Sequence, residues 1–209
     1  MPNLFVITGA NGAGKSTLSQ FLLPNEIAHL NVFDGDLFFV KSLQEIFPSQ
    51  TKSPKYARDM AFQATVQEFE KLVNSAIESN LSFAYEGHFS TESPWQIIRQ
   101  FKEKGYHITM IFLMVEELAI SLRRVTERVK TGGHYVTPQE IEKNFYGNII
   151  QLDKHFTLLN DLVIADNSTQ GITNQILYLS DKKIVNCIST SLLPHWFLKH
   201  LPNISSIIK

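Results

Sequence analysis

A glycine-rich octapeptide near the start of the chain constrains the fold more than any other feature. Residues 9 to 16 read Gly-Ala-Asn-Gly-Ala-Gly-Lys-Ser, with two glycines separated by four residues and then lysine and serine. An apolar run, Leu4–Thr8, precedes the octapeptide, and a helical pattern, Lys15–Leu23, follows it and stops at Pro24. A strand, a glycine loop and a helix in this order are the context that the Walker A motif requires. The chain is therefore predicted to have a P-loop fold.

The residue types of this loop suit the binding of phosphate groups. Glycine permits backbone angles that side chains forbid, so consecutive N–H groups can point at phosphate oxygens. The helix that follows adds its positive N-terminal end. Lys15 is expected to bridge the β- and γ-phosphates, and the Ser16 hydroxyl to ligate Mg²⁺. The predicted cofactors are ATP and Mg²⁺, and the predicted cofactor-binding residues are Gly9, Ala10, Asn11, Gly12, Ala13, Gly14, Lys15, Ser16 and Thr17.

Beyond the loop, short β-rich runs alternate with longer helical patterns, which is typical of a parallel sheet covered by helices. We predict an α/β fold, a three-layer P-loop NTPase with a mostly parallel five-stranded central sheet, in one domain over residues 1–209. A small hairpin and a terminal helix are expected in an appendage over about residues 175–209. The five predicted strands are Leu4–Thr8, Asn31–Phe33, Leu81–Tyr85, Ile108–Val115 and Leu162–Ala165, and the hairpin pairs Ile176–Leu179 with Ile184–Ile188.

Capping residues predict where two of the helices begin. Ser93 is expected to be an N-cap, because Pro94 after it suits the first helical position. Thr137 is followed by proline and, three residues on, by Glu140, which together form a capping box. A long helix, Tyr56–Ser79, is predicted from the helical spacing of its apolar residues.

Composition excludes several classes of protein. The formal net charge is -1, from 19 basic and 20 acidic side chains, which disfavours nucleic acid as a partner. The single cysteine, Cys187, suits a reducing compartment, and the start of the chain lacks the basic segment of a secretory signal. The longest apolar stretch, Ile108–Val115, is too short to cross a bilayer. A cytoplasmic protein without membrane contact is expected.

Acidic residues follow two of the predicted strands, where ligands of open α/β sheets bind. Asp34 and Asp36 flank a glycine; one could hold Mg²⁺ and the other could accept a proton from a substrate hydroxyl. Glu86, after the third strand, could support Mg²⁺ or bind a substrate hydroxyl. His88 is a candidate substrate contact, although a loop histidine is often incidental. An acidic turn without a function is the alternative for the two aspartates.

A basic helix and a glycine loop follow the central strand. Arg124 and Arg128 are four residues apart and therefore share one face of the helix. The helix leads into Gly132-Gly133-His134, so a lid is predicted over about residues 124–138 that would bring arginines to the transferring phosphate. The alternative is a solvated helix face with pairs such as Glu127–Lys130.

Together these motifs resemble the zeta-toxin-like P-loop kinases, over roughly residues 3–170. The resemblance is carried by Gly9–Thr17, by 33–36 and 85–87, by the arginine helix with 132–138, and by Asp166-Asn167-Ser168. It implies phosphorylation of a hydroxyl of UDP-N-acetylglucosamine and a small antitoxin partner. It also implies that Asp36 is the general base, Lys15 the phosphate lysine, and Arg124 and Arg128 the charge-neutralising arginines, which leaves Asp34 with Ser16 for the metal. The chain departs from the family pattern at Ile141–Phe145, where consecutive arginines are common, and at His88.

The predicted activity is thus the transfer of the γ-phosphate of ATP to a small hydroxylated substrate. Kinases of the nucleoside or shikimate type share the same core, whereas the near-neutral charge disfavours a polynucleotide 5′-kinase. A nucleotide-dependent switch or ATPase is an alternative of another class. That class needs no acidic base facing an acceptor, so Asp36 favours the kinase.

Overall fold

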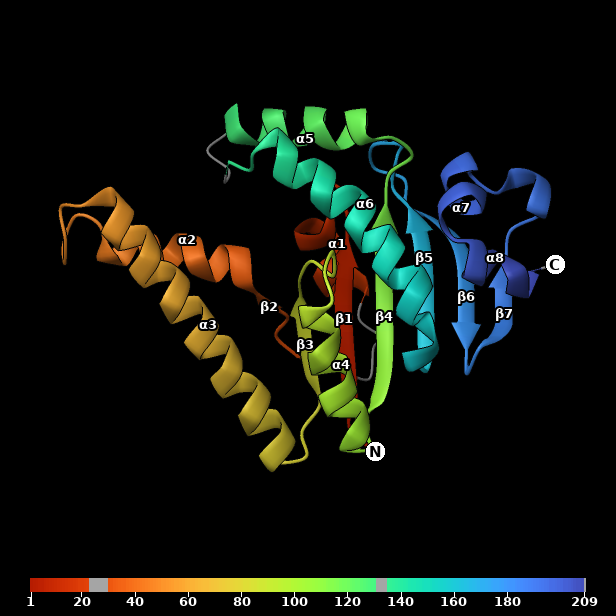
Figure 1. Ribbon diagram of the computed structural model, residues 1–209, viewed down its shortest axis with the longest axis horizontal. Helices are drawn as coiled ribbons and strands as arrows, with labels where there is room; N and C mark the ends of the chain where they lie inside the picture. Colours follow the sequence, from red (N-terminus) through yellow and green to blue (C-terminus); the bar gives the residue numbers. More distant parts are fainter. Residues whose placement is uncertain (23–29, 131–134, 209) are drawn as a thin grey trace.

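The computed structural model describes residues 1–22, 30–130 and 135–208, and a mixed β-sheet runs through its centre (Figure 1). In this part of the chain the sheet has seven strands in the order β2-β3-β1-β4-β5-β6-β7. The strands are β1 (Asn3–Gly9), β2 (Phe33–Asp34), β3 (Phe83–Glu86), β4 (His107–Met114), β5 (Asp161–Asp166), β6 (Asn174–Ser180) and β7 (Lys183–Cys187). The first five are parallel, as predicted.

The hairpin β6–β7 was predicted as an appendage, but it extends the sheet. Strand β6 pairs antiparallel with β5, for example Val163 opposite Tyr178, and β7 pairs antiparallel with β6. Ile176, Leu177 and Leu179 of β6 are buried in the same core as the parallel strands. The predicted five-stranded sheet therefore has seven strands, because an amphipathic hairpin next to an open sheet edge can bury its apolar side by pairing there.

Helices on both faces of the sheet complete the three layers. Connections between parallel strands are right-handed. Helices that connect strands toward one edge of the sheet therefore lie on one face, and helices that connect strands toward the other edge lie on the opposite face. Helix α1 (Lys15–Leu22) leads toward the β2 edge, whereas α4 (Ser93–Glu103) and α6 (Pro138–His155) lead toward β5. Figure 1 shows α4 and α6 in front of the strands. Helix α5 (Leu118–Lys130) lies above them, at the carboxyl ends of the parallel strands.

Two helices that precede β3 form an arm beside the sheet. Helix α2 (Gly35–Ile46) and α3 (Pro54–Glu78) project away from the β2 edge in Figure 1. The arm has a small core of its own around Ile46, Ala57 and Ala61. The sequence analysis identified α3 but not α2. Helix α2 begins at an N-cap, Asp34, whose carboxylate accepts a hydrogen bond from the N–H of Leu37 at 3.0 Å.

The capping predictions have different outcomes. Thr137 is the N-cap of α6, and its capping box with Glu140 is present in both directions. For α4 the prediction of Ser93 as N-cap was wrong: the N-cap is Glu92, and Ser93 is the first helical residue. The carboxylate of Glu92 instead bonds Arg99, Lys154 and His155, which ties α4 to α6.

The C-terminal elements pack back onto β5 and α6. They are α7 (His195–His200) and α8 (Pro202–Ile208). The 3-10 turn η3 (Thr190–Leu192) precedes α7, and another 3-10 turn, η2 (Phe156–Leu158), directly follows α6. The indole N–H of Trp196 donates to the Asp166 carboxylate at 3.1 Å, and Asp153 of α6 accepts from the first turn of α8. The two short helices α7 and α8 occupy the place of the single terminal helix that was predicted. None of the described helices is long and apolar enough to cross a membrane.

Candidate active site

The P-loop joins β1 to α1 and touches the neighbouring strand at its first glycine. Gly9 has φ +135, and a Cβ added there would lie 1.7 Å from the carbonyl oxygen of Leu113 in β4. Gly14 has φ +92, and its Cβ would lie 2.6 Å from Nδ2 of Asn167, the residue after β5. Any other residue would push the loop away from β4 or from Asn167. The shape of the loop therefore depends on these glycines, as the motif predicts.

Lys15 lies against the loop that precedes it. Its side chain is buried, and Nζ donates to the carbonyl oxygens of Gly9 at 3.2 Å and Ala10 at 3.1 Å. Burial lowers the pKa of the Lys15 amine, while the charges of Glu86 and Asp36 oppose that shift. The charge of Arg128 adds to the lowering of this pKa. Lys15 is thus surrounded by the acidic and basic groups that the sequence assigned to one site.

A carboxylate from β3 contacts the P-loop serine. Ser16 Oγ donates to Glu86 Oε1 at 2.8 Å, and the buried Glu86 Oε2 has no hydrogen-bond partner within the described residues. Burial raises the pKa of Glu86 to about 7; Lys15 opposes the shift, and the charge of Asp34 adds to it. Asp34 is paired with Glu86 in the β2–β3 register. Asp36 is exposed in the first turn of α2.

This set of oxygen atoms fits a magnesium ion bound together with a nucleotide. Mg²⁺ takes one or two protein oxygens and completes its shell with water and phosphate. Ser16 Oγ, the unpartnered Glu86 Oε2 and the neighbouring Asp34 offer such oxygens. Among the described residues no cluster of three or more His, Cys, Asp or Glu could hold a metal by itself. A site of this kind would therefore hold Mg²⁺ with its nucleotide and not a structural metal.

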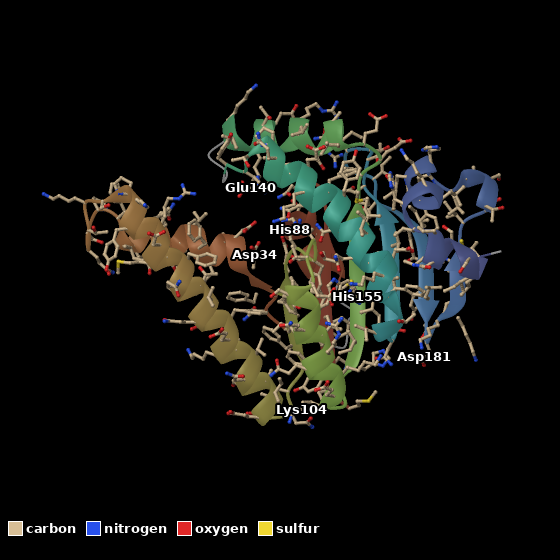
Figure 2. The ribbon with its side chains drawn as sticks, viewed as in Figure 1. Asp34, His88, Lys104, Glu140, His155 and Asp181 are labelled. Carbon is tan, nitrogen blue, oxygen red and sulfur yellow. The ribbon has the colours of Figure 1, made fainter. Side chains whose placement is uncertain are left out.

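His88 lies behind the P-loop as part of a buried polar network. Its Nε2 is 3.2 Å from Asn11 Nδ2, and its Nδ1 is 3.3 Å from Asn148 Nδ2. Burial holds the pKa of His88 well below its ordinary value, and the charge of Lys15 adds to that effect, so the ring is neutral. Figure 2 shows His88 and Asp34 at the same end of the sheet. The predicted histidine thus contacts the loop residue Asn11.

Two asparagines of α6, which the sequence analysis did not identify as site residues, hold this network together. Asn148 Oδ1 accepts from Thr8 Oγ1 at 3.2 Å and from the N–H of Phe89 at 2.6 Å, and its Nδ2 approaches Gly9 O at 3.4 Å. One turn earlier, Asn144 Nδ2 donates to Asn11 Oδ1 at 3.0 Å. Asn148 is fully buried. A polar pair four residues apart on the apolar face of a helix is the sequence signal that could have identified them.

The two arginines of α5 lie in different surroundings. The Arg124 guanidinium donates to backbone oxygens of Gly12 at 3.2 Å, Asn167 at 2.8 Å and Ser168 at 2.9 Å. It therefore joins the P-loop to the loop after β5. Arg128 lies one turn on, and its charge acts on both Lys15 and His88. The predicted Gly-Gly-His segment of the lid, 132–134, lies outside the described residues.

A pocket of about 400 Å³ opens beside these groups, between the arm and the sheet. Glu86 and His88 belong to its wall and also contact the P-loop residues Ser16 and Asn11. The opposite wall comes from α3, including Thr65 and Phe69, and from the first turn of α4. The structure thus places Glu86 and His88 both in the pocket wall and against the P-loop, whereas Asp34, Asp36 and Arg128 do not line the pocket and act on Lys15 through their charges.

Comparisons with known proteins place the chain in a family. A family model described as zeta toxin matches residues 1–177. The chain belongs to the zeta toxin family. In sequence it is similar to a Haemophilus influenzae protein described as uncharacterized, with 30% identity over 138 residues, which are 66% of this chain and 88% of that protein.

Solved structures share the fold of this zeta toxin family member. A complex of AvrRxo1-ORF1 with AvrRxo1-ORF2, determined with ATP, matches with a TM-score of 0.71 and 14% identity over 96% of this chain and 64% of that chain. The chain thus spans less than two thirds of that structure. The PezAT chromosomal toxin–antitoxin system of Streptococcus pneumoniae matches with a TM-score of 0.58 and 16% identity over 100% of this chain and 88% of that chain. Identities this low show a common fold.

Family membership confirms the resemblance drawn from the motifs. It supports a kinase-type enzyme that binds a nucleotide at the P-loop. The acceptor and the roles of the individual side chains are proposals.

Proposed function

We propose that this zeta toxin family member is an ATP-dependent phosphotransferase that moves the γ-phosphate of ATP to a hydroxyl of a small molecule. The observation that carries the proposal is the pocket beside the P-loop. Glu86 and His88 contribute to its wall and contact the loop as well, so an acceptor in the pocket would lie next to the terminal phosphate. A switch or an ATPase has no need of such a pocket.

Nucleotide binding is assigned to the P-loop residues Gly9–Thr17. In the proposed mechanism the Lys15 amine leaves the carbonyls of Gly9 and Ala10 and neutralises the β- and γ-phosphates. Ser16, with Asp34 and Glu86 beside it, would hold Mg²⁺, which supplies charge neutralisation between the phosphates. Asp36 is proposed as the general base, because its charge acts on Lys15 from the exposed first turn of α2.

Phosphoryl transfer depends mainly on the correct positions of the reacting groups and on charge neutralisation, and it needs no covalent intermediate with the enzyme. Asp36 accepts the proton of the acceptor hydroxyl, the hydroxyl oxygen bonds to the γ-phosphorus, and the bond to the β-phosphate oxygen breaks to leave ADP. Arg128 is proposed to stabilise the charge that builds up on the transferring group. Arg124 is proposed to act with it and also to hold the P-loop in place, since it donates to Gly12 O.

The acceptor and the partner that the family resemblance implies are UDP-N-acetylglucosamine and a small antitoxin. The PezAT structure, whose fold this chain shares, comes from a toxin–antitoxin system, which supports the search for a small inhibitory partner. We also propose one kinase domain over 1–209 and a cytoplasmic location, where ATP is available and the thiol of Cys187 stays reduced.

The test is acceptor-dependent phosphorylation by the purified protein. ATP and Mg²⁺ are mixed with UDP-N-acetylglucosamine, nucleosides, shikimate and simple sugars, and the products are identified by mass spectrometry. The expected result is one acceptor that gains a phosphoryl group, with loss of that product in Lys15→Ala. Hydrolysis of ATP at a rate that no acceptor changes would instead favour the ATPase.

A further inference from the structure

The segment after β5 contacts the second half of the P-loop through one side chain. Asn167 directly follows β5, and the proposed chemistry gives its side chain no role. Its Nδ2 donates a hydrogen bond to the carbonyl oxygen of Ala13 at 2.7 Å. A Cβ added to Gly14 would lie 2.6 Å from the same nitrogen. The carboxamide of Asn167 therefore lies directly against the peptide that joins Ala13 to Gly14, immediately before Lys15.

Asn167 is itself held in place at each of its polar groups. Its backbone N–H donates to the carbonyl oxygen of Met114 at 2.8 Å, and its backbone oxygen accepts from Arg124 at 2.8 Å. The hydroxyl of Thr173 donates to Asn167 Oδ1 at 3.1 Å. The carbonyl of Ala13 can only accept, so the nitrogen of the carboxamide must face it. The donor that faces the P-loop thus has little freedom to move.

The P-loop needs such a donor because its glycines leave the orientation of this peptide open. The C=O and N–H of one planar trans peptide point in opposite directions, so the N–H of Gly14 points away from Asn167. Gly14 has φ +92, but glycine accepts negative φ about as readily. A half-turn of the peptide would therefore meet little resistance from the chain itself, and it would replace the N–H by a carbonyl oxygen, which repels phosphate.

We infer that Asn167 is a positioning residue for phosphate binding, because it holds the Ala13–Gly14 peptide with its N–H toward the nucleotide. The inference rests on the proposed function, since it assigns the nucleotide phosphates to the P-loop. Arg124 holds the preceding peptide at the carbonyl oxygen of Gly12. Asn167 carries no charge and hence cannot neutralise phosphate, so its effect on binding comes from the orientation of the loop.

Isothermal titration calorimetry of the full chain in the presence of Mg²⁺ tests the inference with two ligands, ADP and adenosine, which lacks phosphate. In Asn167→Ala the affinity for ADP should fall at least about tenfold, whereas the affinity for adenosine should stay within about twofold of the wild type. Asn160→Ala is the matched control, because Asn160 directly precedes β5 and its carboxamide accepts from the N–H of Ile108 at 3.0 Å. That variant should lose stability and keep its affinity for ADP.

Two results for Asn167→Ala would overturn the inference. They are an unchanged affinity for ADP, and an equal loss for ADP and adenosine, which would mean that Asn167 acts on the nucleoside.

A second pair of variants applies if Asn167→Ala does not fold. The exposed Thr173 can be changed to valine, which removes the hydroxyl that holds Asn167 Oδ1, or to serine, which keeps it. Thr173→Val should bind ADP at least about twofold more weakly than Thr173→Ser. Equal affinities of the two variants would overturn the inference.

The wild-type protein separates a failure of this inference from a failure of the proposed function. If the wild type binds ADP no more tightly than adenosine, the P-loop is not the phosphate site and the proposed function fails. If the wild type prefers ADP and Asn167→Ala keeps that preference in full, only the role of Asn167 is rejected.

Discussion

The two sides of the site, one for phosphate and one for the acceptor, are built in different ways. The proposed phosphate side consists of consecutive residues, Gly9–Ser16, whose backbone is proposed to bind the phosphates and whose glycines fit against Leu113 O and Asn167. The acceptor side takes side chains from β2, α3, β3 and α4, which are far apart in the chain. A loop that binds phosphate through its backbone tolerates few substitutions and binds one kind of group. A pocket lined by side chains can be substituted without a change in the loop. In the proposed function the phosphate side would determine the reaction, and the acceptor side would determine the substrate.

The largest expected effect is on the phosphate side. Lys15→Ala should abolish turnover and weaken ATP binding, because the amine neutralises charge on both terminal phosphates. Steady-state kinetics and nucleotide titration measure the two effects. Lys104→Ala, which is exposed at the opposite end of the molecule (Figure 2), is the control and should behave like the wild type. Near-normal activity of the Lys15→Ala protein would contradict the assignment of the P-loop as the phosphate-binding side.

Asp36→Asn tests whether the acceptor side also carries the base. Phosphoryl transfer should fall by roughly two to four orders of magnitude, while ATP–Mg²⁺ affinity changes little. Asp34→Asn should instead weaken the dependence on Mg²⁺, since Asp34 lies beside Glu86 in the sheet register. Unchanged transfer in Asp36→Asn would reject it as the base, and the opposite pattern in the two variants would mean that their roles are exchanged.

The arginines of α5 test whether catalysis and loop support can be separated. Arg128→Ala should lower kcat by roughly two orders of magnitude and change the KM for ATP less, as expected for charge stabilisation in the transition state. Arg124→Ala should show the same loss in kcat and also a lower Tm, because the P-loop and the loop after β5 lose their common donor. Arg123→Ala, exposed on another face, is the control. A change in KM alone would make either arginine a binding group.

Asn148 joins the two sides, so its loss should appear as instability. Asn148→Ala leaves the Thr8 hydroxyl and the N–H of Phe89 without their acceptor, which costs about 2–4 kcal/mol of unfolding free energy. Urea denaturation measures the change. The exposed Asn186→Ala in β7 should stay within about 0.5 kcal/mol of the wild type. Equal stability of the two variants would contradict a structural role for the network.

The smallest expected effect is a pH dependence caused by Glu86. Burial raises its folded pKa from 4.5 to about 7, so between these values the unfolded chain has lost a proton that the folded chain retains. Stability contributed by this group is therefore present at low pH and falls as the pH rises toward about 7. The Tm of Glu86→Gln minus that of the wild type should therefore rise as the pH increases across this window. A difference that is flat or falls with pH would contradict a buried, proton-holding Glu86.

Sequence reasoning reached the phosphate side more completely than the acceptor side, for physical reasons. The Walker A residues are contiguous and their geometry is local, so the loop, its strand and its helix could all be predicted. Helix α2 was missed because its start signal, Asp34, had been assigned to the site and not to an N-cap. Asn148 was missed although its spacing from Asn144 was a signal, because the partners that give it a role, Thr8 and Phe89, are far away in the chain. The hairpin could be recognised from its turn, but its place in the sheet depends on the open edge of β5.

The contact between Trp196 and Asp166 has a practical consequence for expression of this protein. The family match ends at residue 177, in the middle of β6, yet Trp196 lies well beyond that point and its indole N–H bonds the carboxylate that also accepts from the N–H of Ser168. Ser168 in turn accepts from Arg124. A chain cut at the family boundary would expose the edge of β5 and uncover a core that holds Phe197, Leu201 and Ile204. Fragments intended for enzymology should therefore extend through α8.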